Sequence, residues 1–280
     1  MEKKFYKLHG LGNDMIVIDD RKGEIAPYEM GRVARKLCNR RTGIGGDCLL
    51  VAKESDIADI AMLVYNSDGT QAQMCGNGIR CAALTARLSG RAAGDEMTVD
   101  TLSGLQRIRV DMNGADALVT VNMGQPVFTR EALGIKAPDI DPDNVVLTSG
   151  GEEVTVHGVF MGVPHGIVFT DDVSRERVAA LGPGIEKHPV FSEGINADFV
   201  RVEEDGSLTI RTWERGAGPT LACGTGACAA VIAAVELGLC EKGRDVKVTL
   251  LGGELTVNYT DERVLLTGGA QEVFTGSFEL

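Results

Sequence analysis

The sequence predicts an α/β (α+β) protein built from two like domains. Each domain is expected to be a mainly antiparallel sheet or barrel wrapped around one central helix. The main observation is a repeat: a cysteine, a Gly-rich turn and an apolar, alanine-rich run occur at Cys75 and again at Cys223, 148 positions later. Short alternating polar and apolar runs, typical of strands, surround both copies. So long a period indicates duplicated domains and not a solenoid.

In the first half, strands are expected at 5–9, 15–19, 48–52, 60–65, 97–100, 105–111 and 118–123. An amphipathic helix is expected over 28–38, where apolar residues recur on one face. The first central helix is expected from Gly78 to Leu88, because Ser89 and Gly90 provide a stop signal.

In the second half, residues 124–154 are rich in proline and acidic residues and are expected to form a linker and excursion. Strands are expected at 158–162, 167–170, 199–202, 208–214, 246–251, 254–259, 263–267 and 273–274. Helices are expected over 173–181 and from the second cysteine motif to Leu237. We expect residues 1–122 with 270–280 to form one domain and residues 123–269 to form the other.

Composition excludes several classes of function. The net charge of −12 and the lack of a basic block argue against nucleic-acid binding. The longest apolar run, 227–235, is too short to cross a bilayer, and the first residues lack the apolar core of a signal peptide. Seven cysteines, an odd number, are a poor disulfide framework and fit a reducing compartment. We therefore expect a cytoplasmic protein whose partner is a small molecule.

The repeated motif predicts unusual thiols. A cysteine at a helix N-terminus lies beside free N–H groups and the positive end of the helix dipole, which lower a thiol pKa. Two such thiols on opposite faces of one carbon could remove a proton from one side and return one on the other, which inverts a stereocentre. The helix N-termini could also bind a carboxylate and stabilise developing negative charge. This chemistry requires no metal or cofactor.

Simpler interpretations of the same residues remain open. Cys75 and Cys223 could be small buried residues at helix starts. The other five cysteines are expected to be small buried residues or bystanders: Cys38, Cys48, Cys81, Cys228 and Cys240. A zinc site combining Cys75 with Cys81, or Cys223 with Cys228, has the wrong spacing for the usual cysteine pairs. The Gly-rich stretch at 43–46 lacks the Lys-Ser/Thr of a phosphate-binding loop.

The chain resembles the diaminopimelate epimerase family, of the cofactor-independent amino-acid racemases, over essentially its whole length. The segments that carry the resemblance are His9–Asp14, Tyr65–Gly69, Met74–Gly78, Pro164–His165, Glu214–Gly218 and Ala222–Gly226. The resemblance implies two pseudo-symmetric domains with the active site in the cleft between them. It implies inversion of LL-2,6-diaminopimelate to the meso form, in lysine and peptidoglycan precursor synthesis.

The resemblance also implies roles for individual residues. Cys75 would donate the proton and Cys223 would accept one in the LL-to-meso direction, with roles exchanged in reverse. His165 and Glu214 would modulate the thiol pKa values. The implied substrate-binding residues are Asn13, Asn66, Gly76, Asn77, Asn196, Glu214, Arg215, Gly224 and Thr225. A homodimer is also implied, although Phe274 replaces a tyrosine that the family uses at a dimer contact.

Two positions depart from the family pattern. Val163 stands where the family usually has an asparagine, and that asparagine resembles a contact to the distal end of the substrate. Cys48 stands where some members have a substrate-contacting glutamine. Val163 therefore motivates a second hypothesis, a racemase of another amino acid such as histidine. A third hypothesis is a non-catalytic amino-acid-binding or redox-sensing protein that uses the paired thiols, which an oxidant could join as a disulfide.

Overall fold

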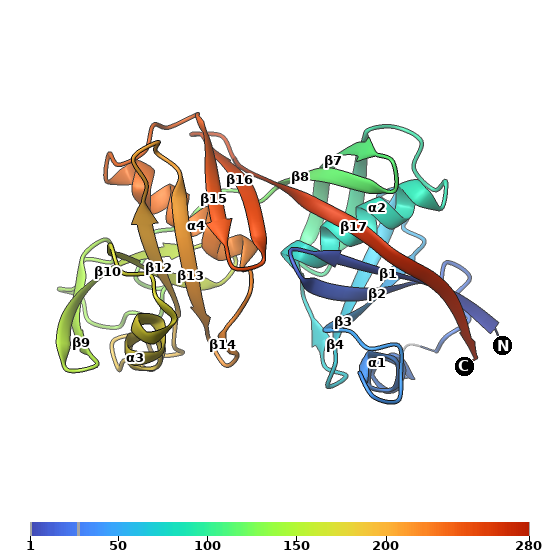
Figure 1. Cartoon of the computed structure of the whole chain (residues 1–280), viewed down its shortest axis with the longest axis horizontal. Coiled ribbons are helices and arrows are strands. Elements are labelled where there is room, and N and C mark those ends of the chain that lie inside the picture. Colours follow the sequence, from blue (N-terminus) through green and yellow to red (C-terminus); the bar gives the residue numbers. More distant parts are fainter. Residues whose placement is uncertain (1, 27–28, 280) are drawn as a thin grey trace. The chain divides into compact units, whose positions relative to one another are not determined.

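The computed structural model describes residues 2–26 and 29–279. The chain divides into two compact units, Met1–Asn122 with Thr267–Leu280, and Met123–Leu266. Figure 1 shows both units, each with strands around a helix. In the described part of the chain, no helix is both long enough and apolar enough to span a membrane.

The first unit is a closed barrel. Its strands are β1 (Glu2–Gly10), β2 (Asn13–Asp19), β3 (Cys48–Lys53), β4 (Ile60–Asn66), β6 (Glu96–Thr101), β7 (Gly104–Asn113), β8 (Asp116–Asn122) and β17 (Val264–Glu279), with the short β5 (Gln71–Ala72) beside β4. They pair in the order β1–β2–β3–β4–β6–β7–β8–β17 and back to β1. The pairs β2–β3 and β4–β6 are parallel, and the pairs β17–β1, β1–β2, β3–β4, β6–β7 and β7–β8 are antiparallel. Closure of the sheet into a barrel leaves an interior for apolar side chains, and this interior holds the central helix.

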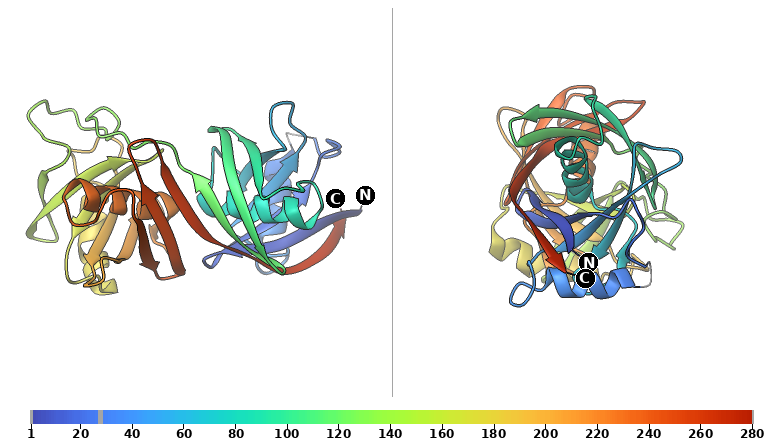
Figure 2. Two further views of the ribbon diagram at one scale, coloured as in Figure 1. Left: turned by 90° about the horizontal axis from the view of Figure 1, so that it is seen from above. Right: turned by 90° about the vertical axis from the view of Figure 1, so that its right-hand side faces the viewer.

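Helix α2 (Gly76–Leu88) occupies that interior. It contacts β1, β2, β3, β4, β6, β7 and β8, and its residues from Asn77 to Ala86 are buried. The right-hand view of Figure 2 shows α2 enclosed by the strands of this unit. The amphipathic helix α1 (Met30–Cys38) instead covers β3 and β4 from outside, with Met30, Val33 and Leu37 buried. The Tyr28 end of the expected helix lies outside the described residues.

The second unit repeats the same plan. Its elements are β9 (Val145–Ser149), β10 (Glu152–Phe160), β11 (Pro164–Phe169), α3 (Arg175–Glu186), β12 (Asn196–Val202), β13 (Leu208–Glu214), β14 (Gly218–Pro219), α4 (Gly224–Glu236), β15 (Asp245–Leu250) and β16 (Gly253–Tyr259). The parallel pairs β11–β12 and β13–β15 correspond to β2–β3 and β4–β6. Helix α4 contacts β10, β11, β12, β13 and β16. The predicted fold class, two like α+β domains each with a central helix, is confirmed.

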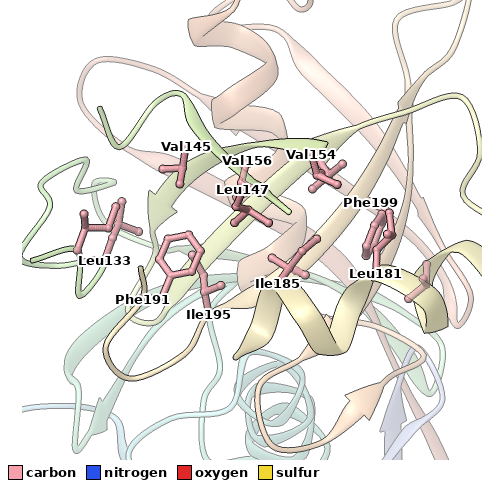
Figure 3. Packing of buried hydrophobic residues seen from close by; sticks show 14 of the residues in the cluster. Leu133, Val145, Leu147, Val154, Val156, Leu181, Ile185, Phe191, Ile195 and Phe199 are labelled. Carbon is pink, nitrogen blue, oxygen red and sulfur yellow. The ribbon is translucent and has the colours of Figure 1, made fainter. Parts of the chain in front are cut away.

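A second core lies between α3 and the sheet of this unit. Leu181 and Ile185 of α3 pack with Phe199 of β12 and with Leu147 and Val156 of the neighbouring hairpin (Figure 3). Successive strand residues point to opposite faces of a sheet. Phe199 and Ala197 therefore belong to this core, whereas Asp198 between them points the other way, toward α4.

The structure corrects the expected linker at 124–154. Residues 145–149 and 152–160 form an antiparallel hairpin, β9 and β10, with Val145 and Leu147 buried. Its two-residue turn is Gly150-Gly151, with φ angles of 59° and 86°. Positive φ at both positions is what a tight hairpin turn requires. The prolines and acidic residues that suggested a linker lie mostly outside this hairpin.

Two other boundaries also differ from expectation. Helix α3 continues past Leu181 to Glu186, because the glycines there serve close packing and do not end the helix. A Cβ at Gly182 would lie 2.6 Å from Trp213 Cγ, and one at Gly184 would lie 2.2 Å from Ser149 Oγ. The two short strands expected at 263–267 and 273–274 are parts of one strand, β17, which has 16 residues.

Candidate active site

Cys75 and Cys223 occupy the same position in their two units, the N-cap of the central helix. Their backbones are extended, with φ and ψ of −139° and 116° at Cys75 and of −119° and 112° at Cys223. The N–H of Gly78 donates to the Cys75 sulfur over 3.3 Å, and the N–H of Gly226 donates to the Cys223 sulfur over 3.4 Å. Each sulfur thus takes the place of a capping oxygen at the positive end of the helix dipole.

The surroundings of Cys75 favour its thiolate. A hydrogen bond with the Cys48 thiol is the main cause that lowers the pKa of Cys75, to about 7. Burial opposes this shift, while the N–H groups of Gly78 and Asn77 and the charge of Arg80 support it. The same contact, together with burial, raises the pKa of Cys48. Cys48 therefore stays protonated and acts as a hydrogen-bond donor; its sulfur also lies 3.0 Å from Met15 Sδ.

A polar network holds Asn13 and Asn77 at the mouth of α2. Asn13 Oδ1 accepts from Asn77 Nδ2 over 3.3 Å and lies 4.0 Å from the Cys75 sulfur. Asn13 Nδ2 donates to Asp47 over 2.8 Å. The fully buried Arg80 donates to Asn77 Oδ1 over 2.8 Å and to the Gly76 carbonyl over 3.2 Å. The two asparagines are thus oriented before any ligand binds.

The surroundings of Cys223 favour its protonated form. Burial, followed by the nearby carboxyl groups of Glu214 and Asp198, raises the pKa of Cys223 well above the usual value for a thiol. Its sulfur lies 3.4 Å from Thr225 Oγ1, and that oxygen lies 2.9 Å from His165 Nε2. His165 is completely buried, and its Nδ1 lies 2.7 Å from Asp198 Oδ2.

Glu214 and Arg215 lie at the end of β13, before the turn to β14. Burial raises the pKa of Glu214, whose carboxylate accepts from Thr220 Oγ1 over 2.6 Å. Asn196 positions Arg215 through the backbone, because its Oδ1 accepts from the Arg215 N–H over 2.8 Å. The Arg215 guanidinium is exposed and donates to the Glu193 carbonyl over 3.0 Å.

The structure therefore gathers the expected site residues into two groups, one in each unit. Asn13, Asn77, Gly76 and Cys48 surround Cys75, and His165, Glu214, Thr225 and Gly224 surround Cys223. Asn66 is exposed at the end of β4, beside Cys48 in register, and its Nδ2 donates to Thr70 over 3.0 Å. Val163 is half-buried just before β11. Across the described residues, no cluster of three or more His, Cys, Asp or Glu side chains could hold a metal ion.

Sequence reasoning missed Asp198. It is completely buried, and it accepts from both His165 and Thr212, whose Oγ1 lies 2.6 Å from Asp198 Oδ1. The available signal was one acidic residue within the otherwise apolar run at 197–200. A buried charge in such a strand must be hydrogen-bonded, and it therefore points to a polar partner.

The two groups differ in their acid–base chemistry. One helix carries a thiol that ionises near neutral pH, and its counterpart carries a thiol that retains its proton. The first can remove a proton and the second can supply one. The N–H groups at each helix start are available for a carboxylate.

Comparison with known proteins identifies the family. The diaminopimelate epimerase family model matches residues 5–129 and 158–273. The chain is 40% identical over 277 residues to the diaminopimelate epimerase of Desulforudis audaxviator, covering 98% of this chain and 99% of the relative. It is 43% identical over 278 residues to that of Desulfitobacterium hafniense, covering 96% of each. A hydroxyproline epimerase from Agrobacterium vitis, crystallised with trans-4-hydroxy-L-proline, shares the fold with a TM-score of 0.71 and 17% identity, over 100% of this chain and 93% of that one. On this evidence the chain belongs to the diaminopimelate epimerase family.

Proposed function

We propose that the protein is an isomerase that converts LL-2,6-diaminopimelate to the meso form without a cofactor, using Cys75 and Cys223 as its two proton carriers. The observation that carries the proposal is the pair of N-cap thiols with opposite preferred protonation. The names of relatives at 40% and 43% identity support the choice of substrate. The reaction belongs to lysine and peptidoglycan precursor synthesis.

The proposed reaction transfers one proton at each face of the α-carbon. In the meso-to-LL direction the Cys75 thiolate removes the α-proton and the Cys223 thiol supplies the new one. In the LL-to-meso direction Cys223 removes the proton and Cys75 supplies it. The negative charge that develops on the substrate is stabilised by the N-termini of the two helices. The mechanism requires both thiols to reach one carbon from opposite sides.

The proposed binding groups divide between the two ends of the substrate. The turns Gly76-Asn77 and Gly224-Thr225 would hold the carboxylate at the reacting carbon with backbone N–H groups. Asn13, Asn66, Asn196 and Arg215 would contact the remaining polar groups. The Val163 side chain offers no hydrogen bond, so we assign recognition of the distal end of the substrate to Arg215 and its neighbours.

We further propose that residues 1–122 with 270–280 and residues 123–269 act as two epimerase domains. We also propose a homodimer, since Val273 and Phe274 of β17 are 56% and 46% exposed, respectively, and present an apolar surface. Light scattering after size exclusion tests the dimer. We place the protein in the cytoplasm, because seven cysteines, an odd number, are a poor disulfide framework and fit a reducing compartment.

The function is tested with reduced protein in D₂O, incubated separately with LL-diaminopimelate, meso-diaminopimelate and L-histidine. We expect deuterium at the α-carbon and inversion of both diaminopimelate isomers. Exchange of histidine alone would transfer the proposal to another racemase, and exchange of none would favour a binding or redox-sensing protein. Cys75→Ala and Cys223→Ala should each reduce inversion by at least about 10³-fold. Near wild-type turnover in either variant would rule out the two-thiol mechanism.

A further inference from the structure

We propose that Asp198 is a positioning residue for the reaction: it holds His165 so that Nε2 can exchange a proton with Cys223 through the Thr225 hydroxyl. This inference rests on the proposed function, because it assigns the means by which Cys223 becomes a base. Asp198, His165, Thr225 and Cys223 all belong to the second unit.

The four groups form one continuous chain of contacts. Cys223 Sγ lies 3.4 Å from Thr225 Oγ1, which lies 2.9 Å from His165 Nε2. His165 Nδ1 lies 2.7 Å from Asp198 Oδ2. His165 and Asp198 are each completely buried, so water cannot replace either partner without rearrangement.

Every hydrogen bond in this chain of contacts has a donor and an acceptor, whether Cys223 is protonated or ionised. With Cys223 protonated, its thiol donates to Thr225 Oγ1, and the Thr225 hydroxyl donates to neutral Nε2. When the thiol proton moves to Thr225 and the Thr225 proton moves to Nε2, a thiolate and an imidazolium result. Nε2 then donates to Thr225, whose hydroxyl donates to the thiolate. Only the direction of the two hydrogen bonds changes, and no atom needs to move far.

Asp198 keeps His165 in the tautomer that this reversal of the hydrogen bonds requires. In both forms His165 Nδ1 carries a proton and donates it to Asp198, so the exchangeable proton is always on Nε2. The carboxylate also stabilises the imidazolium that forms when Cys223 loses its proton. Without an acceptor at Nδ1, the imidazole could take the other tautomer, in which Nε2 cannot receive the thiol proton.

Asp198 is itself held from three directions. The register places it opposite Thr212 on β13, whose hydroxyl donates to Oδ1 over 2.6 Å. His165 occupies Oδ2 from β11. Helix α4 approaches closely, because a Cβ at Gly226 would lie 2.6 Å from Asp198 Oδ1. This position at the start of α4 also favours a negative charge.

The charged groups around Cys223 allow a decisive test, because two interpretations predict opposite effects. The carboxyl groups that face Cys223 are Asp198 on β12 and Glu214 on β13, and the imidazole of His165 faces it from β11 through Thr225. If Asp198 acts only as a nearby negative charge, its removal makes the Cys223 thiolate easier to form. If Asp198 acts through His165, its removal makes that thiolate harder to form.

The experiment measures the alkylation rate of Cys223 by iodoacetamide against pH, with mass spectrometry of the Cys223 peptide, in the full-length reduced protein. For Asp198→Asn we expect the pH midpoint of Cys223 labelling to move upward, because the amide offers one acceptor where Thr212 and His165 both donate. We expect kcat to fall roughly 10²-fold while KM changes little. A midpoint that moves downward, or does not move, would overturn the proposal.

Two further sets of variants separate this role from a loss of folding. Thr225→Val removes the bridging hydroxyl and keeps Asp198, so it should also move the Cys223 midpoint upward. Thr225→Ser keeps a hydroxyl, so its Cys223 midpoint should stay at the wild-type value. Asp20→Asn is the matched control, because Asp20 is also buried but pairs with Lys3 and Lys53 in the other unit. It should leave the Cys223 midpoint unchanged; an upward shift of equal size there would contradict the proposal.

The labelling readout needs no substrate, so the two proposals can fail separately. If the wild-type protein inverts neither diaminopimelate isomer, the proposed function fails, whatever the midpoints are. If it inverts them and Asp198→Asn leaves the midpoint in place, the positioning role alone fails.

Discussion

The backbone N–H of Gly78 donates to the Cys75 sulfur over 3.3 Å, so the thiol caps the helix that follows it. Gly226 and Cys223 repeat this contact at 3.4 Å. The two caps are nearly identical, yet the two thiols differ in acidity because their other neighbours differ. A thiol and an amide donate hydrogen bonds to Cys75, whereas carboxyl groups face Cys223.

The acidity of the two thiols predicts the order of their labelling. The thiolate is the reactive form, and the pKa of Cys75 is about 7, so its alkylation should rise through a midpoint near pH 7. The pKa of Cys223 is raised, so labelling of Cys223 should require a distinctly higher pH. As pH falls below 7, Cys75 gains a proton, and kcat/KM should decline by about tenfold per pH unit. Faster labelling of Cys223 than of Cys75 at pH 7 would contradict the assignment.

Cys48 should control the acidity of Cys75. Its hydrogen bond is the largest cause that lowers the Cys75 pKa, so Cys48→Ala should raise the Cys75 labelling midpoint by about one pH unit. Cys38→Ala is the matched control, since it also removes a buried thiol from this unit. If the two variants give the same Cys75 midpoint, Cys48 has no such role.

Val163 should limit the affinity for diaminopimelate. An asparagine here could donate to, or accept from, the distal end of the substrate, and one such bond is worth about 1–2 kcal/mol. Val163→Asn should therefore lower KM by roughly 5- to 30-fold with little change in kcat. Val163→Leu has nearly the same size without the amide, and its KM should stay close to wild type. Equal KM values for the two variants would mean that the amide makes no contact.

Gly226 should be intolerant of a side chain. Its Cβ would lie 2.6 Å from Asp198 Oδ1, so Gly226→Ala should destabilise the protein by about 1–3 kcal/mol. The start of α2 provides a control, because a Cβ at Gly76, the counterpart of Gly224, meets nothing within 4 Å. Thermal unfolding of both variants measures the difference; equal losses would show that the contact with Asp198 is not limiting.

Local patterns in the sequence were enough to predict the two helix starts, their cysteines and the repeated plan of the units. An N-cap followed by small residues and an apolar run is a short-range signal, so it can be recognised from neighbouring residues alone. The β9–β10 hairpin was missed because the prolines and acidic residues of 124–154 indicated a linker. The extent of α3 was missed because Gly182 and Gly184 serve packing against Trp213 and Ser149, which lie far away in the sequence.

The sequence alone determined that two cysteines stand at matched helix starts. Tertiary structure decided how the two thiols differ. Cys48 reaches Cys75 from β3, and Asp198 reaches His165 because β11 and β12 run parallel, with both side chains directed toward α4. The acidity of a buried group depends on what surrounds it in space. Strands that are adjacent in the sheet but distant in the sequence supply those surroundings.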